Sequence, residues 1–135
     1  MKIELTDLQF RRLLDMVYIG NWILNSNRGM DRFTDYDDVE SFLFSLCPSV
    51  GMSSLTDFSC GVAKPSEAFE DGGIHDAISE HENAVFFEIL AEELARRDME
   101  FEPTNPEDLD ELSDRIESYI DEFEQNGIDN IIFDK

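Results

Sequence analysis

The alternation of apolar and polar residues along this 135-residue chain predicts four long helices. Their expected ranges are 6–26, 35–47, 79–99 and 106–125. The first begins with a capping box, because Thr6 and Gln9 stand in the spacing that this motif requires. The last has Asn105 as its N-cap and Pro106 at its first position, and Gly127 follows as a C-terminal cap. The pattern therefore predicts an all-α fold, a small helical bundle of about four main helices.

The first predicted helix is apolar on almost every side between Leu13 and Leu24. Nine of these twelve positions carry large apolar side chains, which is typical of a buried helix rather than one that faces solvent. We therefore expect this hydrophobic N-terminal helix at the centre of the bundle, with Val17, Trp22 and Leu24 buried.

Three polar side chains of this helix are expected to have structural roles. Asp15 lies one turn after Arg11 and Arg12, which predicts an ion pair. Asn21 and Asn25 are four residues apart and share a face, where we expect hydrogen bonds to a neighbouring loop rather than to a ligand.

The middle of the chain changes from helix to irregular structure. The second helix should end before Pro48, since proline disfavours helical geometry in the residue that precedes it. Its expected apolar stripe is Val39, Phe42, Leu43 and Leu46. Gly, Ser and Pro are frequent in residues 48–74, so this segment is expected to be irregular apart from a short helix at 66–71. The residues expected to anchor it to the core are Leu55, Phe58, Val62 and Phe69.

The two C-terminal helices complete the predicted bundle. The third should start at Ser79, because Ser79 and Glu82 form a second capping-box signature. The fourth has an apolar face made of Leu109, Leu112, Ile116, Tyr119, Ile120 and Phe123. Residues 128–133 are expected to form a short extended piece that returns to the core. The whole chain, residues 1–135, is expected to be a single acidic helical domain.

Acidic residues dominate most of the chain, whose formal net charge is −22. Residues 1–34 carry five bases and four acids, whereas residues 35–135 carry five bases and 28 acids. Such a field repels nucleic acid and anionic membranes and attracts basic proteins. The sequence therefore predicts no direct nucleic-acid or membrane binding. Neither a membrane-spanning apolar run nor a signal peptide is recognisable, which predicts a cytoplasmic location.

Six carboxylates recur at steps of three and four residues along the last helix, so they share one face. This acidic column consists of Glu107, Asp110, Asp114, Glu117, Asp121 and Glu124. Its neighbouring side chains stand about 5–6 Å apart, slightly closer than phosphates along a nucleic-acid strand. Phage and plasmid inhibitors of restriction and CRISPR enzymes share this small, acidic, helical composition, although no family motif accompanies the analogy. The column is either a phosphate-like array for a basic partner or only a solvated face.

The sequence contains no recognisable catalytic motif. It has no nucleophile elbow, phosphate-binding loop or dinucleotide-binding motif. His75 and His81 are its only histidines, and their spacing differs from that of zinc-binding helices. We therefore predict no catalytic residue, no metal site and no cofactor, and an enzyme is the less favoured interpretation.

The sequence thus favours a non-catalytic cytosolic protein that acts through protein–protein contacts. Its acidic surface would engage a basic partner, in the sharpest case as an inhibitor that mimics DNA or another polyanion. Two alternatives stay open. One is an immunity or antitoxin-like protein that neutralises a basic toxin, and the other is a small metal-dependent hydrolase that uses His75 or His81. The sequence determines neither the partner nor the oligomeric state.

Overall fold

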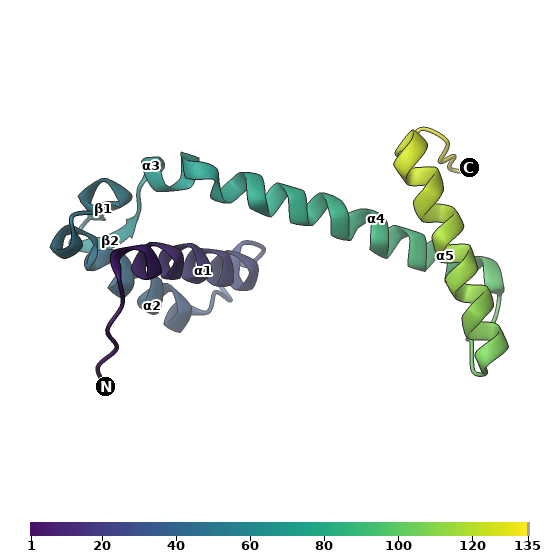
Figure 1. Ribbon diagram of the computed structural model, residues 1–135, viewed down its shortest axis with the longest axis horizontal. Coiled ribbons are helices and arrows are strands. Elements are labelled where there is room, and N and C mark those ends of the chain that lie inside the picture. The colour runs from purple at the N-terminus through teal and green to yellow at the C-terminus, as the bar shows by residue number, and fades with distance from the viewer. Residues whose placement is uncertain (135) are drawn as a thin grey trace. The chain divides into compact units, whose positions relative to one another are not determined.

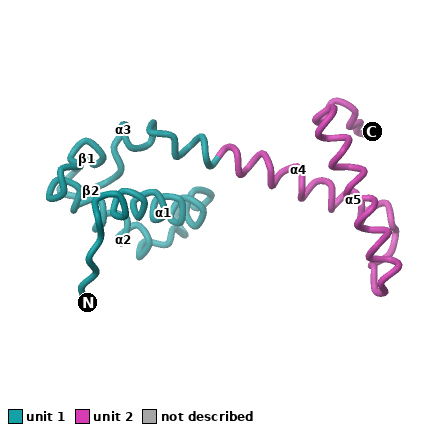
Figure 2. The backbone as a smooth tube through the Cα atoms, viewed as in Figure 1, with its two compact units in different colours: residues 1–78 teal, residues 79–135 magenta. Residues whose placement is uncertain are grey.

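The computed structural model describes residues 1–134, and the chain divides into two compact units, Met1–Ile78 and Ser79–Lys135 (Figure 2). Residues 1–134 contain four long helices: α1 (Asp7–Asn25), α2 (Thr34–Ser45), α4 (His75–Met99) and α5 (Pro106–Asn126) (Figure 1). The predicted, mostly helical fold is confirmed. Among residues 1–134, none of the helices combines the length and apolar character needed to cross a membrane. The single domain expected from the sequence stays a prediction.

The helices with the clearest terminal signals, α1 and α5, are capped as the sequence predicts. The Thr6 hydroxyl accepts a hydrogen bond from the Gln9 amide at 3.2 Å, and the Gln9 side chain accepts one from the Thr6 amide at 2.9 Å. At the start of α5, Asn105 accepts a bond from the Asp108 amide at 2.9 Å. Gly127 follows α5 and supplies its C-terminal cap. Each cap satisfies backbone groups that have no partner inside the helix.

α4 begins at His75, four residues before the predicted Ser79. The predicted cap at Ser79 is wrong because the capping-box signature lies inside the helix. Ile78 is buried and extends the apolar side of α4 towards its N-terminus, which favours helix there. A π-helical turn, Glu70–Ile74, leads into α4, and its Gly73 has a φ of 107°, a conformation that favours glycine.

The segment expected to be irregular contains a β-hairpin that the sequence analysis missed. β1 (Thr56–Ser59) pairs antiparallel with β2 (Val62–Pro65). Cys60 and Gly61 form the two-residue turn, with φ values of 52° and 77°. Two positive φ values match a type I′ turn, whose twist fits the strands it connects.

The hairpin reaches the core through a small side chain. Ala63 is buried, whereas the predicted anchors Phe58 and Val62 are exposed. Val62 points to the opposite face of the hairpin from Ala63, because successive side chains alternate along a strand. Phe58 pairs directly with Ala63 across the hairpin, yet its side chain is exposed. The other two predicted anchors are confirmed, since Phe69 is buried and Leu55 packs against the core.

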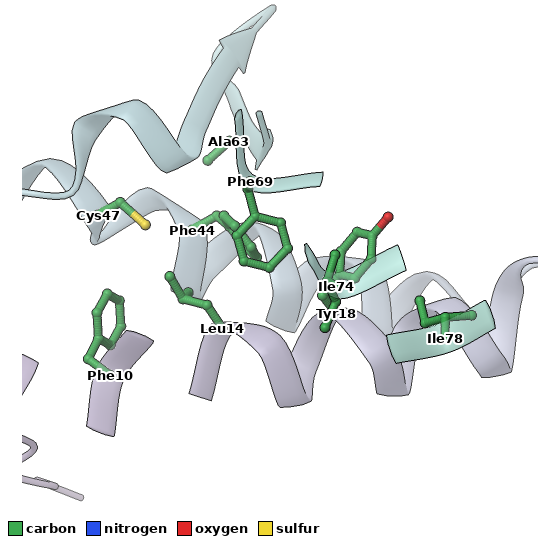
Figure 3. Packing of buried hydrophobic residues seen from close by; sticks show 9 residues of the cluster. All are labelled: Phe10, Leu14, Tyr18, Phe44, Cys47, Ala63, Phe69, Ile74 and Ile78. Atoms are coloured by element: carbon green, nitrogen blue, oxygen red, sulfur yellow. The ribbon is translucent and has the colours of Figure 1, made fainter. Parts of the chain in front are cut away.

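An aromatic cluster forms the core of unit 1, Met1–Ile78 (Figure 3). Phe69 comes from α3 (Glu67–Phe69), which confirms the short helix expected in this segment, and its side chain is completely buried. Its ring centroid lies 5.2 Å from that of Tyr18 and 4.9 Å from that of Phe44, both edge-on. The other members are Phe10, Leu14, Cys47, Ala63, Ile74 and Ile78. Edge-on aromatic packing adds to the stabilisation from burial.

α1 is not confirmed as the buried centre of a bundle. The helix buries a single stripe, made of Phe10, Leu14, Tyr18, Asn21 and Asn25. Met16 and Ile23, on its other side, are exposed, and Val17, Trp22 and Leu24 are only partly buried. In unit 1 the elements that cover α1 pack along one side, so the remaining apolar residues face outwards.

Asp15 and Asn25 of α1 have the predicted structural roles, whereas Asn21 bonds to side chains of α2 instead of a loop. Arg11 and Arg12 pair with Asp15, with N–O distances of 2.7 and 3.3 Å. Asn25 is buried and fixes the loop before α2. Its amide nitrogen donates to the Phe33 carbonyl at 3.1 Å, and its carbonyl oxygen accepts from the Phe33 amide at 2.8 Å.

α2 buries Phe44 instead of its predicted apolar stripe. Phe44 is completely buried because α2 meets α1 and β2 with this side. Val39, Phe42 and Leu46 belong to the predicted stripe and are exposed, while Leu43 is partly buried. Phe42 and Leu46 instead help to line an open apolar hollow beside the N-terminal arm.

Unit 2, Ser79–Lys135, is built from the C-terminal part of α4 and from α5, which pack antiparallel. Met99 packs with Leu112 near one end of the pair. Near the other end, the ring centroids of Phe87 and Phe123 lie 5.5 Å apart. Ala95 is completely buried between these contacts. Alanine lets two helices approach closely but contributes little apolar area, so this core is small.

The chain after α5 does not return to the core, and the prediction of a packed extended piece is wrong. Ile132 and Phe133 are 88% and 83% exposed. A turn follows α5 and leads to residues 131–134, which have no regular structure. Among residues 1–134 the only sheet is the hairpin of β1 and β2, so this segment has no strand partner.

Candidate functional site

The six carboxylates of the acidic column lie on one exposed face of α5. Each of the six is exposed: Glu107, Asp110, Asp114, Glu117, Asp121 and Glu124. Since each residue turns an α-helix by about 100°, steps of three and four keep the six within a stripe about 100° wide. Leu112 and Phe123 are buried on the opposite side of α5. Packing against α4 therefore holds the column towards solvent.

No member of the column forms an ion pair within residues 1–134. The arginines of unit 2 pair with other acids: Arg96 with Glu92 and Glu102, Arg97 with Asp98, and Arg115 with Glu111. These three arginines are therefore engaged elsewhere and do not compensate the charge of the column.

The column carries its charge at a spacing comparable with that of a nucleic-acid strand. From Glu107 to Glu124 the helix rises about 26 Å, at about 1.5 Å per residue. Six charges over this length give one about every 5 Å along the axis, compared with one about every 3.4 Å for a DNA strand. Measured along the axis, the array is therefore more dilute than a strand of DNA, although the direct distances between neighbouring side chains are slightly shorter than those between phosphates.

The acidic column lies in a unit whose other residues also carry a net negative charge. Ser79–Lys135 contains 19 acids and four bases, a net charge of −15. Met1–Ile78 contains 13 acids and six bases, a net charge of −7. A surface of one sign attracts partners of the other sign and speeds their encounter. Unit 2 therefore carries most of the attraction for a basic molecule.

A polar contact that the sequence analysis missed fixes α5 against α4. The Tyr119 hydroxyl donates a hydrogen bond to the Asp98 carboxylate, which also pairs with Arg97 at 2.7 Å. The bond from Tyr119, followed by that from Arg97, holds the pKa of Asp98 below its usual range. The signal in the sequence is a tyrosine in an apolar stripe, because a hydroxyl placed there needs a partner. Tyr119 thus helps to set the orientation of the column.

A second polar cluster, also missed, surrounds His75 in unit 1. The Tyr18 hydroxyl lies 3.4 Å from a Glu70 carboxylate oxygen and 2.6 Å from His75 Nε2. Because the hydroxyl has one proton, its donation to Glu70 makes it the acceptor of a proton from His75 Nε2–H. Burial, followed by the negative charge of Glu70, raises the pKa of Tyr18 to about 12. Tyr18 therefore stays a neutral hydroxyl near neutral pH.

A hydrogen-bond network beside this cluster connects α1 to α2. The Asn21 amide donates to Asp37 at 3.0 Å and to Glu40 at 3.1 Å. The hydrogen bond from Arg32 lowers the pKa of Asp37, whereas burial raises the pKa of Glu40. Within residues 1–134, every buried side-chain nitrogen or oxygen has a hydrogen-bond partner. The network is therefore satisfied without a ligand and has a structural role.

His75 and His81 are not joined by further ligands into a metal site. His75 contacts Tyr18, and His81, six residues later on α4, is exposed. In the part of the chain that the structure describes, no three His, Cys, Asp or Glu side chains are grouped as a metal ion requires. The hydrolase alternative therefore gains no support from the geometry.

Comparison of this chain with protein-family models, curated proteins and solved structures finds no match. Its function is therefore inferred from its own residues. The surface of α5 is the strongest candidate, because charge, exposure and helix geometry coincide there.

Proposed function

We propose that this chain is a non-catalytic protein that acts through protein–protein contacts, with the acidic column of α5 engaging a basic partner. One observation carries the proposal: six exposed carboxylates share a helix face and pair with no cation of residues 1–134. Like charges at this spacing weaken a helix. Lysine and arginine side chains of a partner would relieve that repulsion and gain favourable contacts.

The sharpest form of this proposal is an inhibitor that imitates a polyanion such as DNA. Proteins that bind nucleic acid present lysine and arginine side chains to a line of phosphates. The column offers carboxylates in a similar line, at intervals of about 5 Å along the helix axis. A basic groove built for a strand would attract this face of α5, and the charge of unit 2 would speed the encounter.

An immunity or antitoxin-like role would use the same face of α5. Its partner would be a basic toxin instead of an enzyme that acts on nucleic acid. The two roles share their contact chemistry, so the identity of the partner distinguishes them.

Neutralising part of the column tests the proposal. The column variant combines Asp110→Asn, Asp114→Asn, Glu117→Gln and Asp121→Asn, which remove four charges with little change in shape. Wild type and column variant serve as baits in a lysate of the source organism, at low and at moderate salt. Far-UV circular dichroism verifies that the variant keeps its helices.

We expect wild type to retain a basic protein that the column variant retains poorly. Binding should fall steeply with added salt, because exposed charges are screened beyond about 8 Å at physiological ionic strength. Equal capture by both baits at both salt concentrations would show that the column is only a solvated face.

A further inference from the structure

Unit 2 leaves much of its apolar surface outside its own core. Its buried apolar residues are Ala91, Ala95, Met99, Leu112 and Phe123, of which two are alanines. Phe86 and Ile89 of α4 and Leu109 of α5 are each at least half exposed. Two helices alone enclose little volume, and an apolar surface rimmed by polar residues marks an interaction site.

A groove between α4 and α5 adds apolar surface that is separate from Phe86, Ile89 and Leu109. It encloses about 330 Å³ and is lined by Ala84, Phe87 and Glu88 of α4 and by Ile120, Phe123 and Glu124 of α5. The rings of Phe87 and Phe123 lie 5.5 Å apart in its wall. Phe86 lies 5.1 Å from Phe87, and Tyr119 lies 6.1 Å from Phe123. Aromatic rings thus extend from the groove along both helices.

The charged residues of the groove are both acidic. Glu88 and Glu124 are exposed, and neither pairs with a cation within residues 1–134. Glu124 is also the last member of the acidic column, so the groove and the column form one continuous surface. The groove therefore offers apolar contact and negative charge at the same place.

The negative charge of the groove and of unit 2 determines which kind of molecule can bind there. A second copy of the chain would bring a like charge, since unit 2 alone carries −15. Nucleic acid and anionic membranes are repelled for the same reason. A segment that combines large apolar side chains with lysine or arginine complements both properties of the groove. Docking of an amphipathic helix between two helices is a recurring mode of peptide recognition.

We infer that the groove between α4 and α5 binds a basic amphipathic helix of the partner. Apolar side chains of that helix enter beside Phe87 and Ile120, and its basic side chains meet Glu88 and Glu124. The inference rests on the proposed function, because it names the part of the basic partner that unit 2 recognises. The added helix would cover the apolar lining of the groove, which the two-helix unit leaves open.

Two matched tryptophan variants isolate the groove. Ala84→Trp places a large ring in the groove, at a position that is exposed in the native protein. Ala77→Trp places the same ring at an exposed position of α4 in unit 1, outside the lining of the groove. Circular dichroism verifies that both full-length variants keep the helical content of wild type.

The probe is a fluorescein-labelled peptide of leucine and lysine, about 18 residues long, which makes about five helical turns. Its leucines follow the i, i+3, i+4, i+7 pattern of an amphipathic helix. A scrambled isomer has the same charge and composition without an apolar face. Fluorescence anisotropy gives the Kd of each peptide for each protein, at low and at moderate salt.

We expect wild type to bind the amphipathic peptide more tightly than its scrambled isomer. Ala84→Trp should weaken that binding about tenfold, the size of effect typical of a central interface contact, and Ala77→Trp should leave it unchanged. The loss should persist at moderate salt, since apolar contacts are not screened. Equal binding of the two peptides to wild type, or equal binding of the amphipathic peptide by Ala84→Trp and wild type, would overturn the inference.

The column variant, which retains Glu124, separates this inference from the proposed function. Weaker binding by Ala84→Trp alone supports the groove and counts against the column. Weaker binding by the column variant alone supports the column and overturns the groove. Sedimentation of the wild type provides a further check. A wild-type dimer that Ala84→Trp dissociates would assign the groove to a second copy of the chain and overturn the inference.

Discussion

Units 1 and 2 use aromatic and acidic residues in different ways. In unit 1, Phe44 and Phe69 are completely buried and pack edge-on in a closed core. In unit 2, Phe86 and Ile89 face outwards around a core that contains two alanines. Unit 1 carries a net charge of −7 and unit 2 carries −15. This difference in core and in charge is the basis of the proposal that unit 2 offers contacts to a partner, whereas the buried aromatic side chains of unit 1 stabilise its fold.

The largest expected effect is on the stability of unit 1. Phe69→Ala removes a ring that contacts Tyr18 and Phe44, and it should lower the free energy of unfolding by about 3–5 kcal/mol. Trp22, the single tryptophan, packs against the same core, so its fluorescence during urea denaturation reports on unit 1. The matched change in unit 2 is Phe86→Ala, and the loss of helix measured by circular dichroism reports its effect. The free energy of unfolding should change by less than about 0.5 kcal/mol because this ring is half exposed. Similar decreases in the free energy of unfolding for Phe69→Ala and Phe86→Ala would contradict the proposed difference between the units.

The next effect concerns two carboxylates with opposite pKa shifts. Burial raises the pKa of Glu40 in unit 1, so the folded state favours its protonated form. The stability from this group is fully present below its ordinary pKa and is lost as the pH rises through the raised value. Glu40→Gln should therefore be more stable than wild type at pH 7, and the difference should disappear below about pH 4. Urea denaturation followed by Trp22 fluorescence measures it.

Asp98 in unit 2 should behave in the opposite way. Its pKa is lowered by Tyr119 and Arg97, so its contribution to stability is present above the ordinary pKa and is lost as the pH falls through the lowered value. Asp98→Asn should be less stable than wild type at pH 7 and should approach it in acid. Circular dichroism follows the loss of helix. A greater stability of Asp98→Asn at pH 7 would contradict the role given to this contact.

A smaller effect is expected from the column variant in the absence of a partner. Removing like charges should stabilise α5 by about 0.2–0.5 kcal/mol for each relieved pair. Thermal unfolding followed by circular dichroism should show a slightly raised Tm at low salt. The gain should shrink as salt screens the remaining charges. A lowered Tm would mean that these carboxylates already have favourable contacts.

The prediction with the smallest expected effect is that no change in metal content will be seen, because we expect the protein to bind no metal. Protein dialysed without chelator should carry no stoichiometric zinc, iron or manganese when its elements are measured. About one ion per chain, lost when His75 and His81 are both replaced by alanine, would favour the hydrolase alternative. It would also give the region around His75 a chemical role beside its structural one.

The sequence predicts helices best where a cap and an amphipathic pattern agree. Thr6 and Gln9 mark the start of α1, and Asn105, Pro106 and Gly127 mark both ends of α5. The start of α4 is missed because Ser79 and Glu82 match a capping box although they lie inside the helix. The buried Ile78 extends the helix beyond them to His75. Local patterns thus fail where tertiary contacts decide the outcome.

Tertiary packing also explains the other differences. The apolar residues of α1 suggest a buried centre, yet unit 1 covers only the side that carries Leu14 and Tyr18. The hairpin escapes detection because its strands are short and its contact with the core is the small Ala63. The column is predictable because it depends on the spacing along α5 alone. The groove is not predictable in this way, because it forms only where α4 and α5 pack together. The spacing of residues along one helix does not indicate how that helix packs against another.

Association kinetics with matched charge variants test the central claim most directly. The unit 1 variant combines Asp38→Asn, Asp57→Asn, Glu67→Gln and Asp76→Asn, all at exposed positions, and it removes the same charge as the column variant. The basic partner retained by wild type is purified, and its association rate is measured on immobilised wild type and both variants at low salt.

If unit 2 carries the binding surface, the column variant should slow association about tenfold, whereas the unit 1 variant should change it little. Equal slowing by the two variants would mean that the partner senses only the net charge of the chain. That result would contradict a binding face on α5.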